Sequence, residues 1–471
     1  MLFNSIEFLI FLPIVFLLYW FVFNRNLWLQ NAFVLVASYV FYGWWDWRFL
    51  ILIAFTSLCS WVSGLMIERY RKENKKAKFI NVMNIIVNLL ILGLFKYYNF
   101  FVHSFADVFL NGKADGLLLN VVLPVGISFY TFQALSYSID VYRGKITATH
   151  DVVQFFAFVS FFPQLVAGPI ERATNLLPQF SKHRTINYEQ LTDGLRQALW
   201  GLFKKMVIAD NLAVYVNLVY NDVNNYSGFP LIWATLFFAF QIYADFSGYS
   251  DIAIGTAKIF GFNLMTNFKQ PYMSRSIKEF WSRWHISLSS WFRDYVYIPL
   301  GGNRVSYFRH CMNLIITFAI SGLWHGANWT FVLWGLYYGI LLVIEKILSV
   351  KTEKVDDTFR PLQMIRVLCV FILVVLGWSL FRANSLSDAF YIFSHVATIN
   401  SGIIGVPLVS IKTFVMLLLL VLLLFIVDFC CATFIKAKPR KLLRYFIVIL
   451  LILGIYIFGV FEEQSFIYFQ F

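Results

Sequence analysis

The chain has 471 residues, of which 60% are hydrophobic, 20% aromatic and only 13% charged, and its mean hydropathy is +0.69. A soluble fold carries roughly a quarter charged residues, so this composition cannot build a water-facing surface and predicts an integral membrane protein. Lys and Arg outnumber Asp and Glu by 38 to 25, a net charge of +13. We interpret this excess as basic residues beside the cytoplasmic ends of spans, and we expect no nucleic-acid partner.

The apolar stretches are continuous runs, which predicts a bundle of membrane helices and excludes a transmembrane barrel. The first run, from Phe8 to Phe23, has no basic segment before it and no small-residue cleavage site, so we expect a retained span and not a signal peptide. The third run leads into a basic cluster between Arg69 and Lys78, which predicts a cytoplasmic loop. Counting back through three spans then places the N-terminus outside.

The middle third, from Thr147 to Gly322, differs from both ends because polar and charged residues interrupt its apolar runs. Ionisable groups at membrane depth are costly unless they line a cavity or lie at an interface, so we expect the function here. The interrupting residues are Gln164, Glu171, Lys204, Lys205, Asp210, Asp245, Asp251, Lys269, Arg275, Arg283 and Arg293.

The segment from Phe280 to Tyr295 reads FWSRWHISLSSWFRDY. On a helical wheel its large aromatic and leucine side chains fall within an arc of about 120°, with charged residues opposite. This pattern predicts one amphipathic helix at the membrane interface, with His285 at the edge of its aromatic face. The alternative is an interfacial anchor in which that histidine is incidental.

The segment from Ser321 to Gly339, SGLWHGANWTFVLWGLYYG, is almost free of charge and contains His325. A histidine inside an apolar span is by default a functional candidate. Its neutral form leaves one ring nitrogen free to accept a proton, which suits general-base chemistry. If the helix is continuous, Ser321 and Asn328 lie about one turn to either side and could orient the imidazole. A histidine hydrogen-bonded in the bundle core is the alternative.

The last apolar run, Tyr445 to Val460, follows a basic cluster from Lys436 to Arg444 that should be cytoplasmic. The tail, residues 461–471, is then expected at the outer face, so both termini lie outside. Tyr468 is the only nucleophile among the last six residues. A phenol, with a pKa of about 10, lies between a thiol, at about 8.5, and a sugar alcohol, so an acyl group could pass downhill from thioester to phenyl ester to alkyl ester. An interfacial aromatic belt is the alternative for this tail.

Several motifs of other enzyme classes are absent from the sequence. No G-x-S-x-G elbow, HExxH, Walker A or GxGxxG motif opens a plausible site, which removes support for a serine hydrolase, a zinc protease or a nucleotide motor. The five cysteines show no CxxC spacing and are expected to serve packing. We therefore expect no metal site and no bound cofactor.

Long strings of the chain resemble the membrane-bound O-acyltransferase (MBOAT) family, most closely its bacterial branch in alginate and peptidoglycan O-acetylation. The strings extend over nearly the whole sequence. They are MLFNSIEFLIFLPIVF, ASYVFYGWW, LPVGISFYTFQALSYSIDVYRG, FPQLVAGPIER, DFSGYSDIAIG, NFKQPYMSRSIKEFWSRWHISLSSWFRDYVYIPLGGNR and GLWHGANWTFVLWG.

This resemblance implies an all-α polytopic fold, a ring of helices around a central tunnel with about 11–13 membrane segments, re-entrant or interfacial helices included. It is expected as one domain over residues 1–471 with a catalytic core at about 120–345. His325 matches the family's catalytic histidine, and His285 matches a second family histidine. Tyr468 matches the tyrosine of an aromatic C-terminal motif that is proposed to carry the acyl group.

The resemblance further implies a membrane O-acetyltransferase in the bacterial cytoplasmic membrane that takes acetyl from acetyl-CoA as donor substrate. Basic side chains are expected to meet the phosphates of acetyl-CoA, and an extracytoplasmic SGNH-type acetyltransferase is expected to pass the acetyl group to a polysaccharide. A relay with D-alanyl or fatty acyl cargo, and a transporter of an acyl carrier, are the alternatives. The residues expected around the substrate are Trp324, Asn328, Ser321, Lys269, Arg275 and Arg304.

Overall fold

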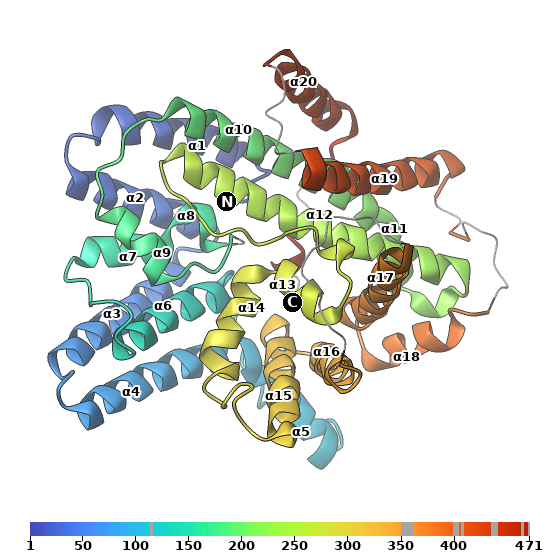
Figure 1. Cartoon of the computed structure of the whole chain (residues 1–471), viewed down its shortest axis with the longest axis horizontal. Helices are drawn as coiled ribbons and strands as arrows, with labels where there is room; N and C mark the ends of the chain where they lie inside the picture. Colours follow the sequence, from blue (N-terminus) through green and yellow to red (C-terminus); the bar gives the residue numbers. More distant parts are fainter. Residues whose placement is uncertain are drawn as a thin grey trace. The chain divides into compact units, whose positions relative to one another are not determined.

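The structure is a computed structural model that describes residues 1–113, 116–166, 168–349, 361–398, 405–406, 409–434, 441–462 and 466–469. Every regular element in these ranges is a helix (Figure 1). Six helical segments are long and apolar enough to cross a membrane, and four shorter apolar segments accompany them. The predicted all-α polytopic membrane protein is therefore confirmed. The ring, the tunnel and the count of 11–13 segments stay predictions. The six long segments are Arg48–Arg69, Asn74–Phe109, Phe229–Ile259, Trp329–Ile347, Gln363–Arg382 and Ile411–Asp428.

The chain divides into two compact units, and each is described by itself. The first comprises Met1–Ala198 with Ser250–Met265, and the second Leu199–Tyr249 with Thr266–Phe471. The predicted single domain is not tested by this division. The first unit contains α1 (Ile6–Leu17), η1 (Leu18–Val22), α2 (Leu27–Gly43), α3 (Arg48–Arg69), α4 (Asn74–Leu92), η2 (Gly93–Tyr97), α5 (Tyr98–Phe109), α6 (Ile127–Tyr142), α7 (Val152–Ser160), α8 (Phe162–Leu165), α9 (Ala173–Phe180) and most of α10 (Tyr188–Phe203).

The second unit carries every residue of the candidate site. Helix α12 (Phe229–Ile259) contributes its first two thirds to this unit and its end to the first. The other elements are η3 (Lys204–Ala209), α11 (Asp210–Tyr220), η4 (Val223–Asn225), η5 (Pro271–Met273), α13 (Ile277–Arg283), α14 (Ile286–Phe292), η6 (Arg293–Tyr297), α15 (Tyr307–His325), α16 (Trp329–Ile347), α17 (Pro361–Arg382), α18 (Leu386–His395), α19 (Ile411–Phe434), α20 (Lys441–Phe458) and η7 (Ile467–Phe469).

Local capping chemistry sets where many of these helices begin. Asn26 accepts hydrogen bonds from the first two N–H groups after the start of α2, and Asp151 does the same for α7. Such a side-chain oxygen satisfies N–H groups that have no partner inside the helix and contributes about 1 kcal/mol. Ser276, Asn328 and Ser385 cap α13, α16 and α18 in the same way. The sequence therefore determines where these helices begin, through the capping residues in the links that precede them.

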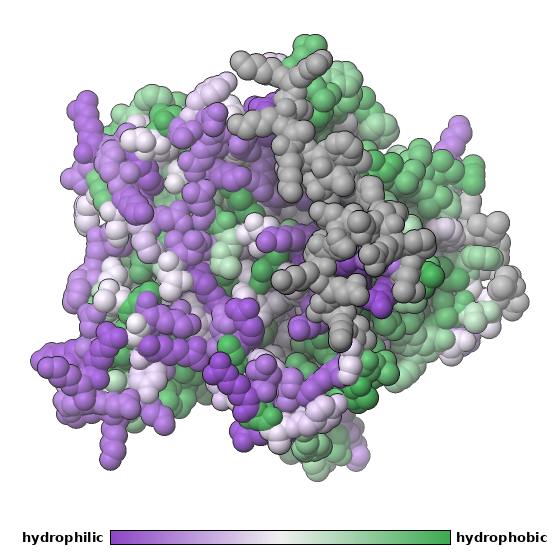
Figure 2. Space-filling model, in the orientation of Figure 1, coloured by the Kyte–Doolittle hydropathy of each residue, from purple (hydrophilic) through white to green (hydrophobic). Residues whose placement is uncertain are grey.

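The predicted order of the N-terminal spans is found in the structure. Three apolar helical segments precede the basic loop, and α3 packs against α4 and α6. Figure 2 shows hydrophilic side chains gathered over the helices of the first unit on the face in view, while hydrophobic side chains predominate over α18 and α19. Exposed apolar side chains on this scale, such as Ile6, Leu9 and Leu419, suit a lipid environment and would be a liability in water.

Six of the eleven polar residues that interrupt the apolar runs of the middle third are buried. Gln164, Glu171, Lys205 and Asp245 are each at most 2% exposed. Buried ionisable groups of this kind need partners inside the protein. In the second unit, three ionisable residues of the middle third form one ion-pair cluster beside the candidate site, namely Lys205, Asp210 and Asp245.

Candidate active site

His325 lies at the last position of α15, where the helix stops. Gly326 leaves the helical path with an extended backbone, and Asn328 caps α16 by accepting from the N–H of Thr330. The condition of a continuous helix, on which the expected position of Asn328 depended, is therefore not met, because a glycine and a capping asparagine end one helix and start another. Ser321 lies one turn before His325 and is buried, while Asn328 belongs to the next helix and donates to the carbonyl of Asn384.

Two glycines bring α15 and α16 into backbone contact. A Cβ placed on Gly322 would lie 2.2 Å from the carbonyl oxygen of Phe331, and one on Gly335 would lie 2.2 Å from that of Phe318. Small residues at facing positions let membrane helices approach this closely. The close approach holds the end of α15, and with it His325, against α16.

His285 lies at a break between two short helices. Trp284 is extended and His285 has a left-handed backbone with φ of 44°, so α13 ends at Arg283 and α14 begins at Ile286. The predicted single amphipathic helix is therefore wrong at its centre. The carbonyl of Asn267 accepts from the N–H of Ile286, and this partner outside the helix replaces the next helical hydrogen bond. A left-handed non-glycine residue is costly, and such strain is concentrated at functional sites.

The side chain of Asn267 determines which ring nitrogen of His285 carries the proton. Its Oδ1 accepts from the backbone N–H of Ser287 at 3.2 Å, so this amide oxygen also faces His285 Nδ1, 3.1 Å away. Nδ1 therefore carries the hydrogen and donates it, which leaves Nε2 with a free lone pair. Nε2 is buried, with no hydrogen-bond partner among the residues that the structure describes. Burial lowers the pKa of His285 to about 3, so the imidazole is neutral.

His285, His325 and Tyr468 form a compact group. The ring centroids of His325 and Tyr468 are 5.5 Å apart, those of His285 and Tyr468 are 6.3 Å apart, and those of the two histidines are 6.4 Å apart. Both histidines are at most 3% exposed. The structure thus brings together the three residues that the sequence named as catalytic. Aromatic rings surround the group, namely those of Phe246, Trp324, Trp334 and Phe381.

The C-terminal tail enters this group with its backbone held. The N–H of Ile467 donates to Asp245 Oδ2 at 2.8 Å, and Phe466 and Ile467 are at most 3% exposed. The tail residues that the structure describes are therefore packed inside the second unit, which argues against the aromatic-belt alternative. Burial and the charge of Asp245 raise the pKa of Tyr468 well above its ordinary value. Its phenol thus stays protonated until a base removes the proton.

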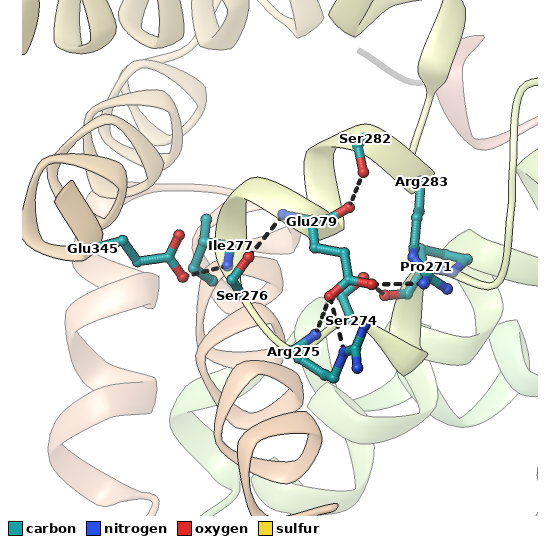
Figure 3. A network of polar contacts seen from close by, with 9 residues as sticks. All are labelled: Pro271, Ser274, Arg275, Ser276, Ile277, Glu279, Ser282, Arg283 and Glu345. Carbon is teal, nitrogen blue, oxygen red and sulfur yellow. Dashed lines mark hydrogen bonds and ion pairs between the residues drawn. The ribbon is translucent and has the colours of Figure 1, made fainter. Parts of the chain in front are cut away.

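The three basic residues expected to meet acetyl-CoA are less buried than the histidines. Lys269 and Arg304 are exposed, whereas the histidines are buried. Arg275 is half-buried and its Nε lies 3.5 Å from Glu279, which also binds Arg283 at 2.6 Å (Figure 3). Glu279 therefore already compensates part of the charge of Arg275.

Two features of the site were missed by reasoning from the sequence. Asn267, which orients His285, gives no periodic signal, because its role depends on a loop that runs beside a helix break. Asp245 was identified as a costly charge, but its contact with the tail could not be predicted. Within the described ranges, no group of three or more His, Cys, Asp or Glu residues could hold a metal ion.

Comparison with known proteins places this geometry in context. The model of the membrane-bound O-acyltransferase family matches residues 142–386, which include both histidines. A protein named probable alginate O-acetylase AlgI, from Pseudomonas aeruginosa, is 43% identical over 395 residues, or 83% of this chain and 74% of that protein. A peptidoglycan O-acetyltransferase from Helicobacter pylori is 34% identical over 429 residues, or 85% and 80% of the two chains. A teichoic acid D-alanyltransferase from Bacillus subtilis is 27% identical over 298 residues, or 59% and 71%.

Proposed function

Because the chain belongs to the membrane-bound O-acyltransferase family, we propose that it is an O-acetyltransferase for a cell-envelope polysaccharide. In this proposal acetyl-CoA in the cytoplasm is the donor substrate, and the acetyl group leaves on the outer face. The relatives at 43% and 34% identity are named as an alginate O-acetylase and a peptidoglycan O-acetyltransferase, which supports acetyl as the cargo and alginate or peptidoglycan as the kind of acceptor. The neighbouring rings of His325 and Tyr468, 5.5 Å apart in a buried aromatic site, carry the proposal.

The chemical step is transfer of acetyl from sulfur to the phenol. His325 takes the phenolic proton as the Tyr468 oxygen attacks the thioester carbonyl, and the C–S bond breaks. The CoA thiolate leaves and recovers the proton from the imidazolium, so the products are free CoA and O-acetyl-Tyr468. The phenyl ester can pass its acetyl group on to a sugar hydroxyl, because a phenol is a better leaving group than a sugar alcohol.

His285 acts beside His325 in this scheme. Since Nδ1–H is committed to Asn267, Nε2 can accept a hydrogen bond from the phenol or from an incoming hydroxyl group. Ser321 and Trp324 are buried near the end of α15, and the Trp324 ring lies beside that of His325, so the proposal assigns both to the substrate side of this histidine. Asn328 serves indirectly, because its cap fixes the start of α16.

The second half of the relay takes place outside the cell membrane. An extracytoplasmic SGNH-type acetyltransferase accepts the acetyl group from O-acetyl-Tyr468 and passes it to a sugar hydroxyl, which regenerates the phenol. In this proposal the protein lies in the bacterial cytoplasmic membrane with both termini outside. The basic loop after α3 supports this for the N-terminus, and the basic cluster from Lys436 to Arg444 supports it for the C-terminus. Lys269, Arg275 and Arg304 attract the phosphates of acetyl-CoA at the cytoplasmic side, where their positive charge suits an anionic substrate.

A D-alanyl cargo is the second candidate, and the resemblance to a teichoic acid D-alanyltransferase favours it. That relative is 27% identical, well below the O-acetyltransferase relatives, so acetyl remains our choice. A transporter of an acyl carrier needs no general base, whereas two buried histidines face a phenol here.

Peptide mass spectrometry of the C-terminal fragment tests the proposal directly. Purified protein is incubated with acetyl-CoA, and the wild type is compared with His325→Ala and Tyr468→Phe. We expect an acetyl group on Tyr468 in the wild type and none in either variant. No acetyl group on the wild-type tail, with acetyl-CoA still consumed when the partner is present, would refute the tyrosine relay. Transfer of D-alanine from a D-alanyl carrier, without transfer of acetyl, would refute acetyl as the cargo.

A further inference from the structure

A buried ion-pair cluster lies where the tail meets α12. Lys205 Nζ is 2.9 Å from Asp245 and 2.7 Å from Asp210, and each of the three residues is at most 3% exposed. The second oxygen of Asp245 accepts the N–H of Ile467, the residue before Tyr468. One cation therefore serves two carboxylates, and a backbone N–H from the tail completes the surroundings of Asp245.

The tail therefore helps to stabilise the buried charge of Asp245. A carboxylate in an apolar helix is costly unless each oxygen has a partner. Lys205 is shared with Asp210, so the tail N–H supplies hydrogen bonding that Asp245 would lose if the tail left. Hydrogen bonds to a charged group are among the stronger ones in proteins.

We propose that Asp245, oriented by Lys205 and Asp210, is a positioning residue that latches the C-terminal tail in the register that presents Tyr468 to His325. This inference rests on the proposed function, since the latch serves the relay through Tyr468. Asp245 itself touches the tail backbone and takes no part in the chemical step.

Further contacts fix the same register at both ends of the tail. The N–H of Val460 donates to the carbonyl of Met206, and Asn211 donates to the carbonyl of Phe458, so the tail leaves α20 along the segment that carries Lys205. At the far end, Phe246 follows Asp245 on α12 and its ring lies 4.4 Å from that of Tyr468. A shift of one residue would replace Tyr468 by a side chain without a nucleophile.

The tail donor can be removed without touching the buried ions. Ile467→Pro deletes the N–H, and proline suits this position because Ile467 opens the 3₁₀ helix η7. Ile467→Val keeps the N–H and is the matched control. Asp245→Ala removes the acceptor from the other side. Asp251→Asn is its control on the same helix, because the carboxylate of Asp251 accepts from Gln197.

Hydrogen exchange of the C-terminal peptide, measured without acetyl-CoA, reports the latch alone. Ile467→Pro and Asp245→Ala should raise the exchange of the tail amides roughly ten- to a hundredfold, because each removes a hydrogen bond to a charged group. The rate of acetyl-Tyr468 formation should fall by a similar factor at saturating acetyl-CoA, with the KM for acetyl-CoA unchanged. Both controls should match the wild type in exchange and in rate.

The outcomes separate the latch from the relay. Unchanged tail exchange in Ile467→Pro, or acetylation of Tyr468 at the wild-type rate in that variant, would overturn the latch and leave the relay standing. A tail that is protected in the wild type and released in Ile467→Pro, but is never acetylated, would confirm the latch and refute the relay.

Discussion

The glycine contact between α15 and α16 yields the sharpest mutational prediction. In Gly322→Ala the new Cβ would lie 2.2 Å from the carbonyl oxygen of Phe331, whereas an ordinary contact is about 3.2 Å or more. The two helices must therefore separate by about 1 Å, and overpacking of this kind costs about 1–3 kcal/mol. His325 lies three residues further along α15, so the imidazole moves with the helix. A displacement of about 1 Å at a reacting group can lower the rate about a hundredfold.

The assay compares acetyl transfer to Tyr468 and thermal unfolding in the same detergent. We expect Gly322→Ala to transfer acetyl about a hundredfold more slowly even well below its unfolding temperature, because the displacement of His325 is present in the folded protein. Gly93→Ala is the control, since a Cβ there meets nothing within 4 Å and the backbone is already helical. Wild-type transfer by Gly322→Ala would refute the argument that this contact positions the histidine.

Three further predictions follow from the same unit. Asn267→Ala removes the acceptor for His285 Nδ1–H, so the kcat for acetyl transfer should fall about tenfold or more while the KM for acetyl-CoA holds; an unchanged kcat would show that the tautomer is irrelevant. His285 has a folded pKa of about 3, below its ordinary value of about 6.5, so its stabilising contribution is complete above pH 6.5 and is lost as the pH falls towards 3. Thermal unfolding of His285→Phe should therefore depend less on pH over that range than unfolding of the wild type. The two carboxylate oxygens of Glu345 accept the N–H groups of Ile277 (Figure 3) and Lys278 at the start of α13, so Glu345→Ala should lower stability by about 1–3 kcal/mol in denaturant titrations. Glu345→Gln keeps one of the two acceptor oxygens and should lower stability by less.

Most of the helices could be predicted, because apolar runs indicate membrane helices and capping residues mark where helices begin. Long apolar runs require helices in lipid, and Asn26 and Ser276 mark helix starts by side-chain chemistry that any chain would use. The helix breaks at His285 and after His325 could not be predicted, because helical periodicity continues through both segments. At His285 the carbonyl of Asn267 offers the backbone a hydrogen bond outside the helix, whereas after His325 the extended Gly326 and the Asn328 cap end one helix and start the next.

The catalytic residues could be named from the sequence for a different reason. His325 and His285 are rare polar residues in nearly charge-free surroundings, and Tyr468 is the single nucleophile of its tail. Such residues stand out because burying them is costly. Their grouping depends on helix packing and could be predicted only through resemblance to a family.

Asp245 shows where prediction from the sequence ends. Its charge within α12 already demands an internal partner, so the need could be predicted from the sequence. The partner could not, because Ile467 contributes a backbone N–H that every residue except proline also has, from a position 222 residues away. No side-chain pattern identifies such a donor. The hydrogen bond therefore depends on the N–H at position 467: Ile467→Pro removes it, while Ile467→Val retains it.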